Sequence, residues 1–501
     1  MIDLLLVNPL FLFEDPVEAK LMTPYFPLGL LYVAAVAREA GYTVEIFDAM
    51  FAESDADFVA ELHRTRPKVV GFGVLATVRR TALRLAALAK SQDATVIMGG
   101  ADPTARPDVY LRHQAAEGQA VDLVAVGEAE ATIVKLLSLL VTDYSFEENP
   151  VTAQTLIRQR LSEIPGVAYR DETGKVVVTE RCALLQNIDD LPYPARDLVN
   201  WAPYRAAWRA NHGSFSMSLI ASRGCPFECA WCQKIVFGRS FRPRDPVSVA
   251  EELRQMKEAY HPDFVRIVDD AMGIQKGWVK AWRDAVLEKD AVIPFECLSR
   301  VDLLDADIVR WLKEAGCQRI ALGAESGSQR VLDAMHKGAR VEQIYHAARI
   351  CRDFGIETYF YMMVGYPSET WQDLLMSAKL LRETRPDIFS TTIAYPLPGT
   401  AFYEQVKDRL PQDDGLVPDW DYTAENRLLF GRSQYSTFFY RRVIRWLHHE
   451  WEDAWIKAGK PAAPAQRLRI RLALWRDRLM VRVLAKLPGL GARAAGWEAG
   501  R

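Results

Sequence analysis

The segment Ser222-Arg-Gly-Cys225-Pro-Phe-Glu-Cys229-Ala-Trp-Cys232 decides the fold of this chain, because it gathers three cysteines at the spacing Cys-x3-Cys-x2-Cys. The apolar stretch 217–221 ahead of it predicts a strand that leads into this loop. Three thiolates on one tight loop can bind three irons of a [4Fe-4S] cubane and leave the fourth iron open. The alternative is a zinc site, but closed zinc sites use four protein ligands, and no Cys or His pair at zinc spacing lies nearby. We therefore expect Cys225, Cys229 and Cys232 to hold a [4Fe-4S] cluster.

Apolar strands alternate with amphipathic helices on the carboxyl side of the loop. Further strands are expected at 263–268, 293–298, 319–323, 358–364 and 388–394. With 217–221 they make six βα repeats, which predicts a partial (β/α)6 barrel rather than a closed eight-stranded one. Polar residues and glycines follow each strand, on the functional face of such a barrel. Asp269 and Asp270, placed at one of these ends, are expected either to contact a ligand or to cap the next helix.

The first 140 residues show the same alternation. Strands are expected at 2–9, 43–47, 69–74, 95–98 and 121–126, each nearly all apolar, which predicts a Rossmann-like, doubly wound parallel sheet. Ligands of such sheets bind beyond the carboxyl ends of the strands. The residues at those ends are Asn8, Pro9, Asp48, Gly99, Gly100, Gly127 and Glu128. The glycines either let a bulky ligand approach the backbone or simply make tight βα turns.

A connector and a helical tail complete the organisation. We predict four parts: 1–145 (the Rossmann-like domain), 146–213 (a connector with a hairpin at 164–179), 214–420 (the partial barrel) and 421–501 (a helical C-terminal region). In the tail, a break at 460–464 precedes an apolar stripe flanked by arginines; the stripe is Leu468, Leu472, Trp475, Leu479 and Val483. One interpretation is contact with a membrane surface or an acidic partner. The one we favour is a helix packed on the barrel with a solvated basic face.

The bulk composition is that of a soluble globular protein. The 501 residues are 50% hydrophobic and 25% charged, a length that suits two or three domains. A net charge of -3 gives no general attraction to nucleic acid. The apolar start 2–10 is too short for a signal peptide and lacks its basic region, and no run is long enough to span a bilayer. The expected location is the cytoplasm.

Several segments resemble a known family. Pro27-Leu-Gly-Leu-Leu-Tyr-Val-Ala-Ala, Glu39-Ala-Gly-Tyr-Thr-Val, Met98-Gly-Gly-Ala-Asp-Pro103 and Val126-Gly-Glu-Ala-Glu resemble a cobalamin-binding domain. The cysteine loop, with Trp231 before its third cysteine, is similar to the radical S-adenosylmethionine (SAM) signature. Their order resembles the B12-binding radical SAM proteins. The resemblance implies a [4Fe-4S] cluster, SAM and cobalamin as cofactors. Because the Asp-x-His-x-x-Gly motif of many cobalamin-binding domains is absent, we expect no histidine of this chain on the cobalt.

The resemblance also implies SAM-binding residues. Gly323-Ala-Glu-Ser-Gly327 looks like the segment that contacts SAM, which makes Gly323, Glu325 and Ser326 candidates. The loop that begins at Gly365 looks like the one near the adenine. Arg300 is a candidate partner for the SAM carboxylate, because a guanidinium pairs with a carboxylate through two hydrogen bonds. The alternative for each charged residue is a helix cap or a surface ion pair.

The activity of the family is what we expect of this chain. Family members cleave SAM reductively to a 5′-deoxyadenosyl radical, and many methylate an unactivated carbon; a secondary metabolite, a lipid or a tetrapyrrole is the expected substrate here. Electrons would come from an external donor of the flavodoxin or ferredoxin type. Three alternatives stay open: ring closure or rearrangement, as in the anaerobic cyclase of chlorophyll biosynthesis; a non-enzymatic cobalamin or metal sensor; and a radical SAM enzyme whose N-terminal domain is only structural.

Overall fold

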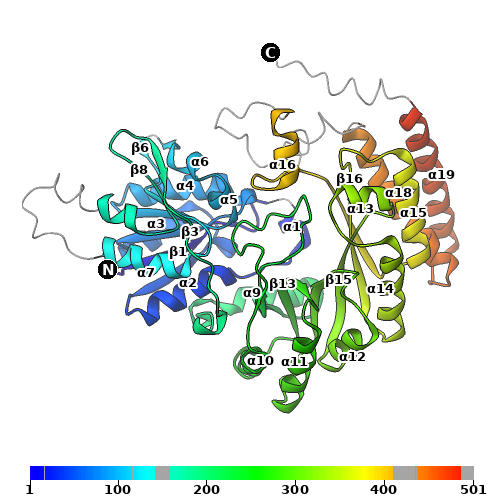
Figure 1. The fold of residues 1–501 in the computed structure, drawn as a ribbon, viewed down its shortest axis with the longest axis horizontal. Helices are drawn as coiled ribbons and strands as arrows, with labels where there is room; N and C mark the ends of the chain where they lie inside the picture. The colour runs from blue at the N-terminus through cyan, green and yellow to red at the C-terminus, as the bar shows by residue number, and fades with distance from the viewer. Residues whose placement is uncertain (16, 116–117, 142–157, 410–434, 436, 487–501) are drawn as a thin grey trace, which may run out of the picture. The chain divides into compact units, whose positions relative to one another are not determined.

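The computed structural model describes residues 1–15, 17–115, 118–141, 158–409, 435 and 437–486 (Figure 1). The chain divides into two compact units, 1–225 with 234–266, and 226–233 with 267–501. The start of the predicted connector and the start of the predicted tail lie outside the described residues. The four-part division of the chain stays a prediction.

The first sheet is the doubly wound sheet that the sequence predicts. Its strand order is β2-β1-β3-β4-β7-β8-β9, and the pairs from β2 to β7 are parallel. These five strands are β1 (Leu4–Asn8), β2 (Val44–Asp48), β3 (Val69–Gly73), β4 (Thr95–Gly99) and β7 (Leu123–Ala125). The chain moves from β1 to β2 on one side and then to β3 on the other. Such a switch of direction is where open α/β sheets bind ligands.

Alternation along each strand divides the core between two faces of this sheet. In β1, Leu5 and Val7 pack in one cluster, with residues of α3 (Asp55–Thr65) and α4 (Arg79–Lys90). Leu4 and Leu6 pack in the other, with residues of α2 (Leu28–Glu39) and α7 (Glu130–Leu140). Successive side chains of a strand point to opposite faces, so an all-apolar strand needs helices on both.

The predicted hairpin extends the first sheet. β8 (Val167–Arg170) pairs antiparallel with β7 and with β9 (Val176–Val178). The structure also contains three helices that the sequence did not predict, α5 (Ala101–Ala105), α6 (Pro107–Leu111) and α9 (Trp201–His212). α9 buries only Tyr204 and Trp208, so its apolar periodicity is too weak to predict a helix.

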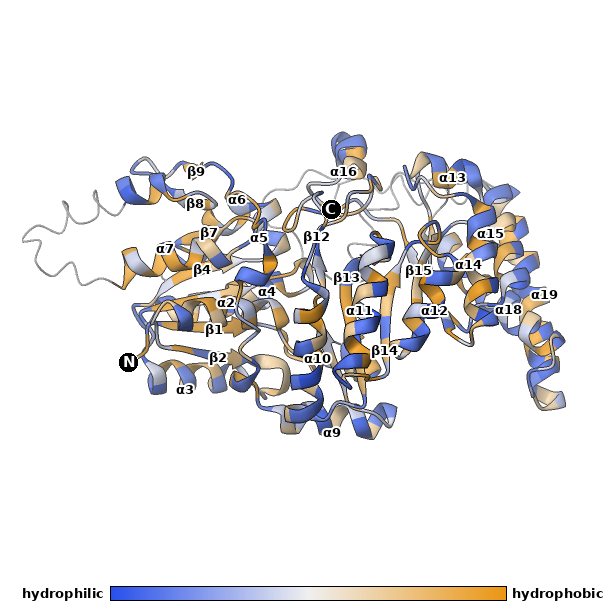
Figure 2. Ribbon diagram, turned by 60° about the horizontal axis from the view of Figure 1, so that its bottom comes forward, coloured by the Kyte–Doolittle hydropathy of each residue, from blue (hydrophilic) through white to orange (hydrophobic). Residues whose placement is uncertain are grey.

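The second sheet confirms the partial barrel. Within the described residues it has six strands in chain order, β10-β13-β14-β15-β16-β17. They are β10 (Ser216–Leu219), β13 (Phe264–Met272), β14 (Phe295–Ser299), β15 (Cys317–Glu325), β16 (Glu357–Val364) and β17 (Ile388–Ile393). The helices between them are α10 (Pro246–Tyr260), α11 (Lys276–Glu288), α12 (Ala306–Glu314), α13 (Gln329–Ala334), α14 (Val341–Asp353) and α15 (Trp371–Thr384). In both sheets the strands are mainly hydrophobic (Figure 2).

One strand end was predicted wrongly. Asp269 and Asp270 lie inside β13, which continues to Met272, and not beyond its end. Neither caps α11, whose N-cap residue is Gln275. The alternation of the strand buries Asp269 and exposes Asp270. Two adjacent aspartates indicate the end of a strand, because the interior of a strand seldom holds charged residues.

The tail confirms the predicted break and corrects the packing of the second helix. α18 (Thr437–Lys457) and α19 (Pro464–Lys486) flank it. α18 packs on α15, with Trp371 and Trp446 rings 5.2 Å apart. The buried residues of α19 are Ile470, Leu474, Asp477 and Val481. The predicted stripe from Leu468 to Val483 is exposed instead. None of the described helices is long and apolar enough to cross a membrane.

Gly100→Ala tests the tight turn after β4. Gly100 has φ +106°, and an added Cβ would lie 2.6 Å from the carbonyl oxygen of Val74. A left-handed backbone and a clash with main chain both oppose a side chain, so we expect unfolding to become easier by about 1–3 kcal/mol. Denaturant unfolding measures it. Gly277→Ala in α11, where nothing lies within 4 Å, is the control and should be neutral or stabilising; equal stability of both variants would contradict this account.

Candidate functional site: a glycine-lined cavity and a three-cysteine loop

A mainly apolar cavity of about 320 Å³ lies in the first unit at the carboxyl ends of β1, β3, β4 and β7. Its lining includes Gly73, Gly99, Gly100 and Gly127, which come directly at or after these strands. At Gly99 an added Cβ would make only ordinary contacts, 3.8 Å from Ala125 and from the Phe72 carbonyl oxygen. At Gly127 nothing lies within 4 Å of an added Cβ. Gly99 and Gly127 therefore leave room at the edge of the sheet, where a bulky ligand can approach the backbone.

Most of the residues predicted for this edge line the cavity. They are Asn8, Gly99, Gly100, Gly127 and Glu128. Pro9 and Asp48 do not belong to the lining. Asp48 instead orients Asn8: its carboxylate accepts hydrogen bonds from the Asn8 amide (2.8 Å) and the Tyr204 hydroxyl (2.6 Å). Burial raises the pKa of Asp48. The described lining residues include no histidine.

A buried charge cluster forms one wall of the cavity. Arg223 contacts Glu128 at 3.3 Å and Glu130 at 2.6 Å, and its side chain is 1% exposed. Arg242 also pairs with Glu128, at 2.9 Å. The Arg223 guanidinium lies over the rings of Tyr32 and Phe237, at 5.1 and 4.9 Å from their centroids. Sequence reasoning missed Arg223 and Glu130, although Arg223 stands two residues before the first cysteine of the motif.

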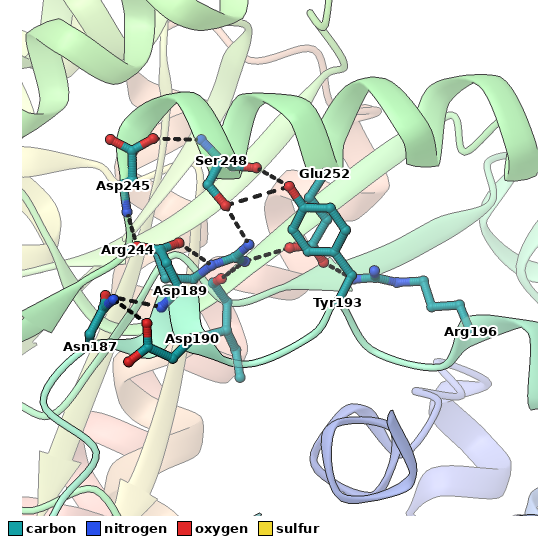
Figure 3. Close-up of polar contacts among 10 residues, drawn as sticks. Asn187, Asp189, Asp190, Tyr193, Arg196, Arg244, Asp245, Ser248 and Glu252 are labelled. Atoms are coloured by element: carbon teal, nitrogen blue, oxygen red, sulfur yellow. Dashed lines mark hydrogen bonds and ion pairs between the residues drawn. The ribbon is translucent and has the colours of Figure 1, made fainter. Parts of the chain in front are cut away.

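A second buried cluster in the first unit fastens the connector to α10 (Figure 3). Glu252 of α10, which is 1% exposed, pairs with both Arg196 and Arg244. The Tyr193 hydroxyl donates to the Ser248 carbonyl oxygen at 3.1 Å. Arg244 follows β12 (Arg242–Pro243), which pairs with β11 (Ser222–Arg223). β11, which carries Arg223, is therefore held by its pairing with β12. Arg244, the residue after β12, is held by its ion pair with Glu252.

The cysteine loop begins directly after β11. Cys225 is buried, Cys229 is partly exposed and Cys232 is exposed; no cysteine is in a disulfide in the described chain. In the second unit the amide of Ala230 donates to the Met335 carbonyl oxygen (2.9 Å), and its own carbonyl oxygen accepts from Phe402 (2.8 Å). These bonds attach the loop to the end of α13 and to α16 (Ala401–Val406).

The donor set of the loop fits an iron–sulfur cluster. Among the described residues, no three His, Cys, Asp or Glu side chains come close enough to bind a single metal ion. Thiolates that hold a cubane are spaced more widely, because each binds a different iron. The loop carries three cysteines, two of them accessible, and its backbone is fixed to the barrel. It can therefore offer one thiolate to each of three irons.

Arg300 lies against this loop. Its Nη1 is 3.4 Å from the Cys229 sulfur, and its guanidinium lies 3.7 Å from the centroid of the Phe227 ring. The carboxylate that it binds in this structure is that of Asp302, through two hydrogen bonds of 2.9 Å. Arg300 therefore brings positive charge to a cluster cysteine, and its role toward the SAM carboxylate stays a prediction.

Gly323 and Glu325 meet at a buried ion pair. Glu325 ends β15 with φ +59°, and its carboxylate lies 3.1 Å from the Nζ of Lys337. A Cβ on Gly323 would come within 2.6 Å of that Nζ and 2.7 Å of the Glu325 carboxylate. Lys337 Nζ also lies 5.3 Å from the centroid of the Trp231 ring, in the cysteine loop. The absence of a side chain at Gly323 thus lets the pair form beside the loop.

The remaining candidates have other partners. The Ser326 hydroxyl is fully buried, 3.3 Å from the Ser377 hydroxyl of α15, and accepts from the Ser328 amide. The Gly365 amide donates to the Glu369 carboxylate at 2.7 Å. Glu369 is completely buried, and burial raises its pKa to about 8. Contact of Ser326 or Gly365 with SAM stays a prediction; Glu369 was not expected from the sequence.

Glu369→Gln should change how stability depends on pH. A carboxyl whose pKa is raised in the folded protein favours folding at low pH, and this advantage is lost as pH rises from about 4.5 to about 8. Gln keeps the acceptor for the Gly365 amide and cannot ionise. We expect thermal unfolding of the wild type, measured from pH 5 to 9, to fall relative to the variant across that range. Glu342→Gln, at an exposed position of α14, is the control; parallel curves for wild type and Glu369→Gln would refute the raised pKa.

Comparisons with known proteins agree with this anatomy. The profile described as B12 binding domain matches residues 15–137, and the Radical SAM superfamily profile matches residues 219–381. An uncharacterized methyltransferase of Pyrococcus horikoshii is 28% identical, covering 78% of this chain and 80% of its own. The anaerobic magnesium-protoporphyrin IX monomethyl ester cyclase of Rubrivivax gelatinosus is 26% identical over 77% and 67%. The hopanoid C-3 methylase of Methylococcus capsulatus is 28% identical over 77% and 70%.

The fold has a solved counterpart. The cobalamin-dependent SAM radical enzyme OxsB, with aqua-cobalamin and SAM bound, superposes with a TM-score of 0.69 at 17% identity, covering 97% of this chain and 72% of that one. Both profiles fall where the structure has the doubly wound sheet and the six-stranded partial barrel. The chain therefore combines a B12 binding domain with a domain of the Radical SAM superfamily, the architecture of the B12-binding radical SAM proteins, whose cofactors are a [4Fe-4S] cluster, SAM and cobalamin.

Proposed function

We propose that this enzyme transfers a methyl group to an unactivated carbon of an apolar substrate, such as a lipid or a tetrapyrrole. The observation that carries the proposal is the glycine-lined, mainly apolar cavity at the carboxyl edge of the first sheet, in a chain that also holds the three-cysteine loop. When bound, the cofactors supply reductive cleavage of SAM and a methyl group to transfer. An external donor of the flavodoxin or ferredoxin type would deliver the electrons.

The cysteine loop and its neighbours would hold the cluster and SAM. Cys225, Cys229 and Cys232 would bind three irons. The guanidinium of Arg300, 3.4 Å from the Cys229 sulfur, would place positive charge beside the bound cluster. The fork of Arg300 binds Asp302 in this structure, and exchange of that carboxylate for the SAM carboxylate would keep its charge paired. Lys337 and Glu325 offer a buried donor and acceptor close to Trp231.

The cavity of the first unit would hold cobalamin. Gly99 and Gly127 leave the sheet edge open, Gly100 lines the same cavity, and Asn8 presents an amide that Asp48 keeps oriented. Arg223 adds a cationic edge whose charge Glu128 and Glu130 balance. We keep the expectation that no histidine of this chain binds the cobalt.

Ring closure is the second candidate reaction. The cyclase relative and the hopanoid methylase relative each cover 77% of this chain, so overall similarity does not separate the two reactions. Both names refer to large, mostly apolar substrates, which supports a substrate of that class here. The mass of the product distinguishes the outcomes, because methylation adds one methyl group and ring closure adds none.

Cys229→Ala should remove both the cluster and the chemistry. Loss of one of three thiolates leaves a second iron without a protein ligand. After anaerobic reconstitution we expect loss of the cluster's iron and visible absorption, and no 5′-deoxyadenosine from SAM and dithionite. Cys182→Ala, at a partly exposed cysteine outside the loop, is the control and should keep both. Undiminished 5′-deoxyadenosine from Cys229→Ala would overturn the cluster assignment.

Gly99→Leu should block cobalamin without unfolding the protein. The φ of Gly99 is not left-handed and its Cβ position is open, so a side chain fits the backbone but occupies the cavity. Wild type mixed with hydroxocobalamin and gel-filtered should retain about one cobalt per chain, and the variant should retain almost none. Ala60→Val, exposed on α3, is the matched control. Wild type without cobalt would contradict the cobalamin proposal, while 5′-deoxyadenosine formation would still support a radical SAM enzyme.

A further inference from the structure

The second tail helix carries an exposed apolar stripe that the fold does not use. Leu468, Leu472, Trp475, Leu479 and Val483 are 60%, 59%, 67%, 49% and 46% exposed. Their spacing of three or four residues puts them on one face of α19. The stripe extends over about 22 Å at 1.5 Å per residue. Figure 2 shows hydrophobic and hydrophilic residues alternating along this helix.

The stripe lies opposite the face by which α19 packs. The buried residues Ile470, Leu474, Asp477 and Val481 contact the rest of the unit. At 100° per residue, the centre of the stripe lies about 170° around the helix from the centre of the four buried residues. A helix that packs on one neighbour needs one apolar face, and α19 has two. The outer one is therefore available to something outside the described residues of this chain.

Arginines border the stripe on both sides. On a helical wheel Arg471, Arg478 and Arg482 fall along one edge, and Arg469 and Arg476 along the other; all five are exposed. Arg478 lies 2.5 Å from Glu450, Arg471 3.7 Å from Asp453 and Arg476 3.1 Å from Asp477, so part of this charge is balanced within the unit. No acidic residue stands on the outer face between Arg467 and Lys486, because Asp477, the acidic residue of α19, is buried. The outer face is apolar in the middle and cationic at its edges.

We propose that this face of α19 docks on the surface of an anionic lipid membrane. A helix of this kind lies in the plane of the interface, with its apolar stripe among the acyl chains and its cations at the head groups. Trp475, the most exposed residue of the stripe, has the amphipathic ring that favours the interface. A second copy of this chain fits less well, because pairing two such faces would bring arginines against arginines. The inference rests on α19 alone and holds whichever reaction the enzyme performs.

Vesicle co-sedimentation tests the proposal on the full-length, cluster-loaded enzyme. One set of vesicles is phosphatidylcholine, and the other also contains phosphatidylglycerol. We expect binding to the anionic vesicles that weakens as salt rises, and little binding to the neutral ones. Trp475→Ser should weaken binding about tenfold or more, since it removes a large apolar side chain from the interface. Arg469→Gln should weaken it about fivefold, the effect of one surface charge.

Matched controls and a second readout separate membrane docking from other causes. Leu287→Ser removes an exposed apolar side chain of α11, 47% exposed, and should leave vesicle binding unchanged. The variants change exposed side chains, so circular dichroism and iron content should equal those of the wild type. Absence of binding to anionic vesicles, or equal binding by Trp475→Ser, would overturn the proposal. So would a concentration-dependent dimer that Trp475→Ser dissociates, because the stripe would then belong to a second copy.

Discussion

A guanidinium taken out of water must be paired with carboxylates, and Arg223 is the residue at which the first unit meets this constraint. Its side chain is almost wholly buried between Glu128 and Glu130, which follow β7, while Arg242 shares Glu128 from the neighbouring strand β12. Removal of one partner would leave an uncompensated buried charge, at a cost of about 3–5 kcal/mol. The pairing therefore ties the carboxyl edge of the first sheet to the strand from which the cysteine loop starts.

The same edge explains how the first unit makes room for a ligand. Its strands are apolar on both faces, and β3 and β4 end in glycines, so packing holds the sheet while a cavity remains at its edge. Polar side chains at the edge are held by neighbours: Asn8 by Asp48, and Asp48 in turn by Tyr204 of α9. An amide with a fixed orientation loses little freedom when it binds a ligand. The polar side chains at this edge are thus held in place by other residues of the first unit.

In the second unit, the cysteine loop depends on residues that are distant in sequence. Met335 and Phe402 hold its backbone, Arg300 lies against Cys229 and Phe227, and the Lys337–Glu325 pair lies beside Trp231. These contacts come from the ends of β14, β15 and α13 and from the start of α16. The carboxyl ends of parallel strands converge, so short loops from separate repeats can build one site. The glycine at 323 belongs to this arrangement because a side chain there would displace the ion pair.

The sequence by itself determined the two sheets, the positions of their main strands along the chain and the cysteine loop, because apolar runs, turn glycines and cysteine spacing are local signals. Only the tertiary structure decided which charges meet: Arg223 with two glutamates, Asp48 with Asn8, and Arg300 with the cysteine loop. It also placed Asp269 within a strand, revealed α9, and turned the predicted stripe of α19 outward. A helical period shows that residues share a face, but only the neighbouring elements decide which face is buried.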